Sequence, residues 1–181
     1  MPTKFFTNEA DNSLLKKFEG TFRYLTDITF FDALVGFFRA SGYFAIRPFL
    51  ENVPYIRILV GINVDKIVAK YHSQGLLFKG DHTMAVEDLN KSLKEDIQNA
   101  KYSKEVEDGI RQFIEDVING KLEVKAHPHR KLHAKIYIFR PQEFNEHSTG
   151  EVITGSSNLT DAGIGNSETS NYEFNVSLRD Y

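Results

Sequence analysis

The chain has 181 residues, of which 41% are hydrophobic and 26% charged, a balance typical of one soluble globular domain. It has no cysteine, which excludes disulfides, thiolate metal ligands and a cysteine nucleophile. The formal net charge of −3 excludes a global field that attracts nucleic acid. The sequence shows no apolar run of membrane-spanning length and no secretory signal, so a cytoplasmic protein without a membrane partner is expected.

Helical and strand patterns alternate along the chain. The first half predicts a helix, a buried strand, a helix after a break at Ser41 and Gly42, a strand and a helix, over 12–25, 31–39, 43–50, 55–63 and 64–74. The second half predicts a long helix over 82–118 and four strands over 121–127, 131–139, 151–156 and 171–179, with a polar turn over 140–150. Strands separated by helices predict an α/β domain with a mixed, largely parallel sheet. No linker or repeat divides residues 1–181, so a single domain is expected.

Positive charge is concentrated in one segment, residues 124–135, which holds four lysines or arginines, three histidines and no acid. Such a strip can hold a phosphate even on an acidic protein, because salt confines each field to about 10 Å. A basic run alone is more often a solvated surface strand. His127 and His129 within it could bind a metal, but no third ligand is evident, so this role is not favoured.

Two polar side chains stand at the head of an otherwise apolar strand pattern. His133 and Lys135 are two positions apart, so on a strand they point to the same face and start about 7 Å apart. That separation suits two groups that contact one phosphoryl group. A histidine on a strand is most often structural, and the phosphate interpretation therefore needs support from elsewhere in the chain.

Two later segments supply that support. In "TGSSN" (154–158), Gly155 permits close backbone approach in a tight turn, and Ser156 and Asn158 offer short polar side chains. Asn158 could instead cap a helix that begins in "LTDAG". In the last predicted strand Glu173 shares one face with other polar residues, while the alternating apolar residues are expected to face the core; these are Tyr172, Phe174, Val176 and Leu178.

These residue types can carry out phosphodiester chemistry without a metal. A neutral imidazole attacks phosphorus, and a covalent phosphohistidine divides one hard step into two easier ones. A lysine ammonium and an amide bind the non-bridging oxygens, where negative charge must be stabilised. A carboxylate bonded to the other ring nitrogen fixes the tautomer. The sequence shows no cluster of acidic residues, so neither a metal nor another cofactor is expected.

The segments "HAK" and "GSSN" resemble the HxK…GSxN signature, or HKD motif, of the phospholipase D superfamily. "ASGYFAIRPFL" and "IRILVG" resemble the N-terminal part of its nuclease-like branch, and "NYEFN" resembles the strand that bears its glutamate. The chain is similar to the phospholipase D-like module at the N-terminus of some bacterial helicases of the DEAD/DEAH type, and to metal-independent restriction endonucleases.

The resemblance implies a sheet with helices on both faces and a role for each matching residue. His133 would be the nucleophile, Lys135 and Asn158 phosphate ligands, Ser156 a supporting residue and Glu173 the partner of the histidine. The family often has an aspartate five residues after the lysine, where this chain has Arg140. Arg140 would either add a phosphate contact or, as we favour, occupy an exposed turn.

The family builds its active site from two HxK motifs, and this chain has one. A homodimer whose twofold axis places two copies of His133 side by side would complete the site. A second domain outside this sequence would do the same. The chain ends in strand-like sequence, so we expect a fragment of a longer protein, with a helicase motor downstream by analogy.

The sequence therefore predicts a phosphodiester-processing domain, a metal-independent nuclease-like module that acts on nucleic acid, with DNA favoured over RNA. A catalytically silent module that binds nucleic acid or dimerises a helicase is the alternative. Lipid phosphodiesterase activity ranks last, because no amphipathic membrane-binding stretch stands out.

Overall fold

The computed structural model describes residues 5–64, 104–126, 132–143, 145–146, 148–166, 168 and 170–179. In chain order its elements are β1 (Phe5–Phe6), η1 (Ala10–Asn12), α1 (Leu14–Tyr24), β2 (Phe30–Phe38), α2 (Ala40–Ile46), η2 (Arg47–Leu50), β3 (Tyr55–Val64), α5 (Lys104–Ile118), β4 (Leu122–Ala126), β5 (Lys135–Arg140), β6 (Glu151–Gly155), α6 (Asp161–Ile164) and β7 (Asn175–Arg179). The predicted elements in these parts of the chain are present, with boundaries shifted by a few residues. The short strand β1 was not predicted.

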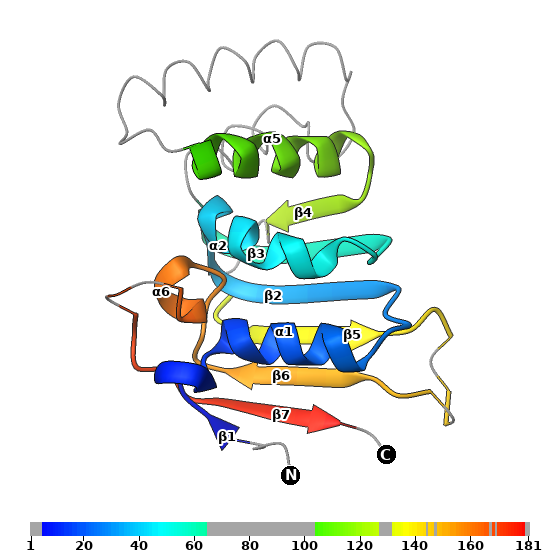
Figure 1. Cartoon of the computed structure of the whole chain (residues 1–181), viewed down its shortest axis with the longest axis vertical. Helices are drawn as coiled ribbons and strands as arrows, with labels where there is room; N and C mark the ends of the chain where they lie inside the picture. Colours follow the sequence, from blue (N-terminus) through cyan, green and yellow to red (C-terminus); the bar gives the residue numbers. More distant parts are fainter. Residues whose placement is uncertain are drawn as a thin grey trace.

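The strands form one seven-stranded sheet in the order β1-β7-β6-β5-β2-β3-β4 (Figure 1). The prediction of an α/β domain with a mixed sheet is confirmed. The expectation of a largely parallel sheet is wrong, since only the pairs β2–β3 and β3–β4 are parallel and the other four are antiparallel. Parallel neighbours need a crossover connection, and the polar segment 141–150 between β5 and β6 is too short to make one.

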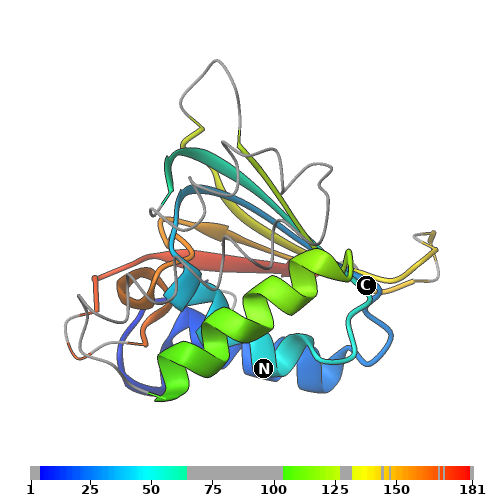
Figure 2. The same cartoon turned by 90° about the horizontal axis from the view of Figure 1, so that it is seen from above.

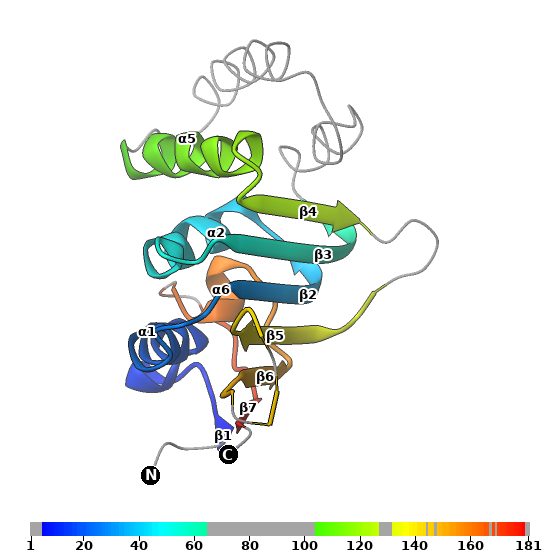
Figure 3. The same ribbon diagram turned by 90° about the vertical axis from the view of Figure 1, so that its right-hand side faces the viewer.

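The helices α1, α2 and α5 all cover the same face of the sheet (Figures 2 and 3). Helices on both faces were expected. The predicted helix over 64–74 and the first part of the predicted helix over 82–118 lie almost wholly outside the described residues. Helical cover on the second face therefore stays a prediction.

Helix α1 anchors the sheet beneath strand β5. The Ser13 side chain caps the helix by accepting a hydrogen bond from the Lys16 amide at 3.2 Å. The buried Phe18 ring then meets the rings of Phe31, Tyr137 and Phe139 at centroid distances of 5.1–5.7 Å. Such edge-on pairs add about 0.5–1.5 kcal/mol each to the burial of the rings. The aromatic packing thus fixes β5, whose first residue is Lys135.

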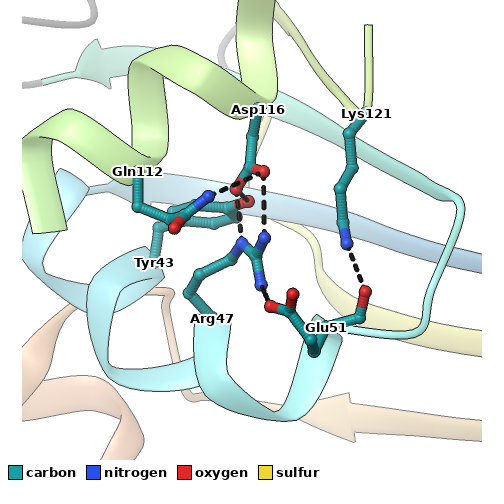
Figure 4. Close-up of polar contacts among 6 residues, drawn as sticks. All are labelled: Tyr43, Arg47, Glu51, Gln112, Asp116 and Lys121. Carbon is teal, nitrogen blue, oxygen red and sulfur yellow. Dashed lines mark hydrogen bonds and ion pairs between the residues drawn. The ribbon is translucent and has the colours of Figure 1, made fainter. Parts of the chain in front are cut away.

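A buried polar network joins α2 and η2 to α5 (Figure 4). The Asp116 carboxylate accepts from the Tyr43 hydroxyl at 2.7 Å and from two nitrogens of Arg47 at 2.5 and 3.1 Å. Arg47 also donates to Glu51 at 2.5 Å. Burial, reinforced by the hydrogen bond to Asp116, raises the pKa of Tyr43 far above its ordinary value. The apolar stripe of α5 was predicted from the sequence, but the buried carboxylate of Asp116 on the same helix was not.

Candidate active site

Four strands bring the candidate residues to one end of the sheet. Strands β2 and β6 end there, and β5 and β7 begin there, as the pairs Val35–Lys135 and Gly155–Asn175 show. This is the end near α6 in Figure 1. A Cβ atom at Gly36 would lie only 3.2 Å from the Leu132 carbonyl oxygen, with Asn158 Oδ1 at 3.5 Å and the Cα of His133 at 3.6 Å. The absence of a side chain at this position therefore lets three segments meet.

His133 and Lys135 are in direct contact. The Lys135 Nζ lies 3.1 Å from His133 Nδ1 and 3.2 Å from Nε2, and it donates to the His133 carbonyl at 3.0 Å. His133 is exposed and precedes β5, whereas the strand was expected to include it. Lys135 is the buried first residue of the strand. The predicted proximity of the two side chains is present, with the imidazole open to solvent and the ammonium behind it.

Lys135 is a cation held in a partly dry position. Burial lowers its pKa, and the negative charge of Glu173 offsets part of this effect. The Thr154 hydroxyl donates to the Lys135 carbonyl at 3.0 Å and fixes the backbone from the neighbouring strand β6. An ammonium that has lost much of its hydration gains strongly from an anion nearby. Lys135 is therefore well placed to bind a phosphate oxygen.

The titration of Lys135 predicts how anion binding depends on pH. Its lowered pKa means that the ammonium loses its proton below the pH at which ordinary lysines do so. As the pH rises from 7 to about 10, the affinity for inorganic sulfate, whose own charge does not change in this range, is therefore expected to fall. In the Lys135→Arg variant the decline should be absent, because a guanidinium stays protonated. Calorimetric titration measures both, and a flat wild-type profile would contradict the assignment.

Glu173 is buried and accepts two hydrogen bonds on this side of the sheet. The Ser156 hydroxyl donates to Glu173 Oε2, and Asn171 Nδ2 donates to Oε1 at 3.0 Å. Ser156 is fixed in turn, since its hydroxyl accepts from the Phe174 amide at 3.0 Å. Among the described residues no hydrogen bond joins Glu173 to His133. Ser156, which was expected to be a supporting residue, thus lies next to the Glu173 carboxylate. The pairing of Glu173 with the His133 imidazole stays a prediction.

Asn158 presents a free amide group toward this end of the sheet. Its Oδ1 accepts from the Phe37 amide at 2.9 Å, which leaves the Nδ2 group without a hydrogen bond to any described residue. The alternative that Asn158 caps the following helix is wrong. Thr160 caps α6 instead, by accepting from the Gly163 amide at 3.1 Å. Asn158 can therefore donate to a phosphate oxygen.

The turn that carries Ser156 and Asn158 is held by buried polar contacts. A side chain at Gly155 would overlap the Phe174 carbonyl, so the predicted close backbone approach is present. Ser157 is fully buried, accepts at its hydroxyl from Asn175 Nδ2 at 2.9 Å, and receives at its carbonyl the Tyr137 hydroxyl at 2.9 Å. These bonds tie the turn to both β5 and β7.

The two faces of the last strand are reversed relative to expectation. Glu173 and Asn175 are buried, whereas Tyr172, Phe174 and Leu178 are 85%, 59% and 53% exposed. The alternation of polar and apolar residues was correct, but its orientation toward the core was wrong. The polar side chains can be buried because they find hydrogen-bond partners on that face: Ser156 for Glu173 and Ser157 for Asn175. Further along the strand, Arg179 donates to the buried Glu151 at 2.9 Å.

Arg140 lies far from the candidate site. It is the last residue of β5, five strand residues or about 17 Å from Lys135. Its guanidinium stacks 3.9 Å from the centroid of the Phe30 ring and lies 3.6 Å from Asp32. Neither earlier expectation holds, since Arg140 is too distant to contact a phosphate there and is half-buried in the sheet rather than in an exposed turn.

A second cation at this end was missed by the sequence analysis. Arg39 follows β2, and its amide donates to the Leu159 carbonyl at 3.0 Å, directly after Asn158. The residue is exposed, and its guanidinium makes no ion pair with a described residue. The available signal was an arginine at the end of a buried strand.

The described part of the chain contains no group of three or more side chains that could hold a metal ion. His127 and His129 lie outside the described residues. None of the described helices combines the length and the hydropathy that crossing a membrane requires.

Three solved structures of yeast tyrosyl-DNA phosphodiesterase are similar to this chain. The wild-type enzyme and one mutant each align with 15% identity and a TM-score of 0.48 over 96% of this chain, and a second mutant aligns with 15% identity and a TM-score of 0.45 over 91%. The chain spans about a third of the length of that enzyme, 31% for the first two. No family model and no curated protein sequence matches the chain.

Proposed function

We propose that this chain is a metal-independent phosphodiesterase domain of the phospholipase D superfamily that acts on nucleic acid, with DNA favoured over RNA. The observation that carries the proposal is the meeting of an exposed imidazole, a partly dehydrated ammonium and a free amide at one end of the sheet. These are the groups of His133, Lys135 and Asn158. They are also the residues that match the HxK…GSxN spacing.

In the first step the neutral His133 ring attacks phosphorus. A nitrogen–phosphorus bond forms, the ester bond breaks, and the leaving oxygen takes a proton from a general acid other than His133 of the same chain. Lys135, the Asn158 amide and Arg39 bind the non-bridging oxygens. In the second step water attacks the phosphohistidine, the nitrogen–phosphorus bond breaks, and the base that accepts the proton of water is the former acid.

The chain supplies one HxK motif, so the general acid must come from elsewhere. We propose a homodimer in which the second His133 plays that part, with the two copies of the site facing each other. A second domain of a longer protein could provide the same group. A helicase motor downstream is an expectation from the resemblance alone.

A catalytically silent binding module is the second candidate. One observation favours it: Lys135 contacts both ring nitrogens of His133, and the hydrogen bonds of Glu173 go to Ser156 and Asn171. In this arrangement the imidazole is not oriented for attack. Substrate binding would have to draw the ammonium onto a phosphate oxygen before the ring is free.

Trapping of the covalent intermediate distinguishes the two candidates. A short oligonucleotide is mixed with the protein in excess chelator, and the reaction is quenched with denaturant at alkaline pH, because phosphohistidine is labile in acid. The proposal predicts a nucleotide adduct on the peptide that contains His133. Saturable binding without cleavage and without an adduct would support the silent module.

A further inference from the structure

Exposed aromatic side chains gather at the same end of the sheet as the candidate site. Phe37, Tyr172, Phe174 and Phe5 are 41%, 85%, 59% and 60% exposed. Isolated exposed aromatic residues are common on protein surfaces. Here Phe37, Tyr172 and Phe174 belong to the segments that form the site, and Phe5 stacks on Phe174, so their exposure calls for an explanation in terms of what the site binds.

Two of these rings are fixed through their backbone to candidate site residues. The Phe37 amide donates to Asn158 Oδ1 at 2.9 Å. Phe174 follows Glu173 and exchanges backbone and side-chain hydrogen bonds with Ser156, each at 3.0 Å. The positions of the rings are therefore set by the same contacts that order the proposed phosphate ligands.

The Phe5 and Phe174 rings form a stacked pair beside the site. Their centroids are 5.7 Å apart and their planes are inclined by 26°. Strand β1 supplies Phe5, which lies opposite Val176 on β7. A pre-stacked pair with exposed rings is a platform on which a flat, apolar group can add at little entropic cost.

Few cations among the described residues adjoin the site. Proteins that hold duplex DNA by its phosphates commonly make 6–10 such contacts. Among the described residues, Lys135 and Arg39 are cations that adjoin the site, and the chain as a whole carries a charge of −3. The exposed rings therefore offer a source of affinity in addition to these two charges.

We propose that the substrate is single-stranded nucleic acid, whose unpaired bases stack on Phe37 and on the Phe5–Phe174 pair to either side of the phosphate. The inference rests on the proposed function and narrows its substrate class. Bases in a duplex are already stacked on each other and offer no free face, whereas unpaired bases do. Stacking accepts any base, so little sequence preference is expected.

The test compares exposed rings near the site with an exposed ring at the opposite end of the same sheet. The variant Phe37→Leu/Phe174→Leu removes rings near the site. The control Tyr55→Leu removes a ring that is 48% exposed and stacked on Phe30 at 5.0 Å, but at the opposite end of the sheet. Affinities are measured by fluorescence anisotropy for a thymidine 20-mer, a hairpin duplex and an abasic 20-mer.

The expected result is that the 20-mer binds at least about tenfold more tightly than the duplex. The double variant should lose about 10- to 100-fold in affinity for the 20-mer and little for the abasic strand, while the control changes neither. For the wild-type protein, a plot of log binding constant against log salt concentration should have a slope of about −1.4, as two phosphate contacts on a single strand imply. Phe5→Leu, at a 60% exposed position in the stacked pair, is a second variant should the double one not fold.

Other outcomes overturn the inference. Equal losses in the variant and the control, equal affinity for the duplex, or equal losses for the abasic strand would each exclude base stacking. If the variant changes only the oligomeric state in sedimentation, the rings belong to an interface between copies of the chain. Hydrolysis of bis(p-nitrophenyl) phosphate, which has no bases, tests the proposed function separately from stacking.

Discussion

Replacement of His133 by alanine is expected to lower phosphodiester cleavage in excess chelator by at least about 1,000-fold. The variant lacks the atom that would form the covalent bond to phosphorus. Lys135 and the Asn158 amide remain, so substrate affinity should change little, and the loss should appear in kcat rather than in KM. Initial rates with an end-labelled oligonucleotide and with bis(p-nitrophenyl) phosphate measure both parameters.

The matched control is Arg111→Ala, which removes an exposed side chain on α5 that pairs with Glu107 at 3.1 Å. It should leave the rate unchanged. Cleavage that survives His133→Ala but disappears with chelator would reveal a metal-dependent contaminant and leave the protein without the proposed activity. Unaltered chelator-resistant cleavage in the variant would exclude His133 as the nucleophile.

The same assay tests the proposed origin of the general acid. If the second His133 of a homodimer protonates the leaving oxygen, the rate per chain should fall when the protein is diluted below the dissociation constant of the dimer. Sedimentation velocity at the same concentrations should show the dimer disappear in parallel. A rate per chain that is independent of dilution, with a monomer in solution, would contradict the dimeric site.

The fold class and most helices and strands could be predicted from the local sequence pattern. Which face of a strand is buried could not. Alternation along 171–178 shows which residues share a face. Which face is buried depends on partners far away in sequence, such as Ser156 for Glu173 and Ser157 for Asn175. The same limit applies to strand direction, because the sequence shows a turn after β5 but not which strand lies beside it.

The candidate site was recognisable because its residues stand in short, specific spacings. His133 and Lys135 are two apart, and Asn158 ends a glycine–serine turn. Arg39 escaped notice because nothing in its own segment connects it to Asn158; the connection is a backbone hydrogen bond from Arg39 to Leu159 across the sheet. The exposed rings escaped notice for the same reason, since the pattern that contains Phe174 is equally typical of a core strand.

The buried charge at Asp116 also lay within a pattern that predicted only apolar packing. Asp116 follows the apolar residues Phe113 and Ile114 on α5, and its position on the helix makes it face Tyr43 and Arg47 on α2 and η2. Asp116→Ala is expected to lower the free energy of unfolding by about 3–5 kcal/mol. The substitution leaves the Arg47 guanidinium with 10% of its side chain exposed and without its main counterion.

Urea unfolding followed by circular dichroism measures this change, with Glu115→Ala as the neighbouring exposed control on the same helix. The control should shift stability by less than about 0.5 kcal/mol. A loss below about 1 kcal/mol for Asp116→Ala would mean that water or Glu51 compensates the Arg47 charge fully.

A second variant separates the cost of an unpaired charge from the worth of the network itself. In Arg47→Met/Asp116→Leu both charges are gone, and the remaining Tyr43 hydroxyl is removed with Tyr43→Phe. Buried ion pairs replaced by apolar groups of similar volume are often as stable as the original. The triple variant should therefore recover most of the stability lost in Asp116→Ala. If it does not, the hydrogen bonds of the network stabilise the protein beyond pairing its charges, and they fix how α5 packs on α2. Helix α5 is followed in the chain by β4 and then by the segment that contains His133.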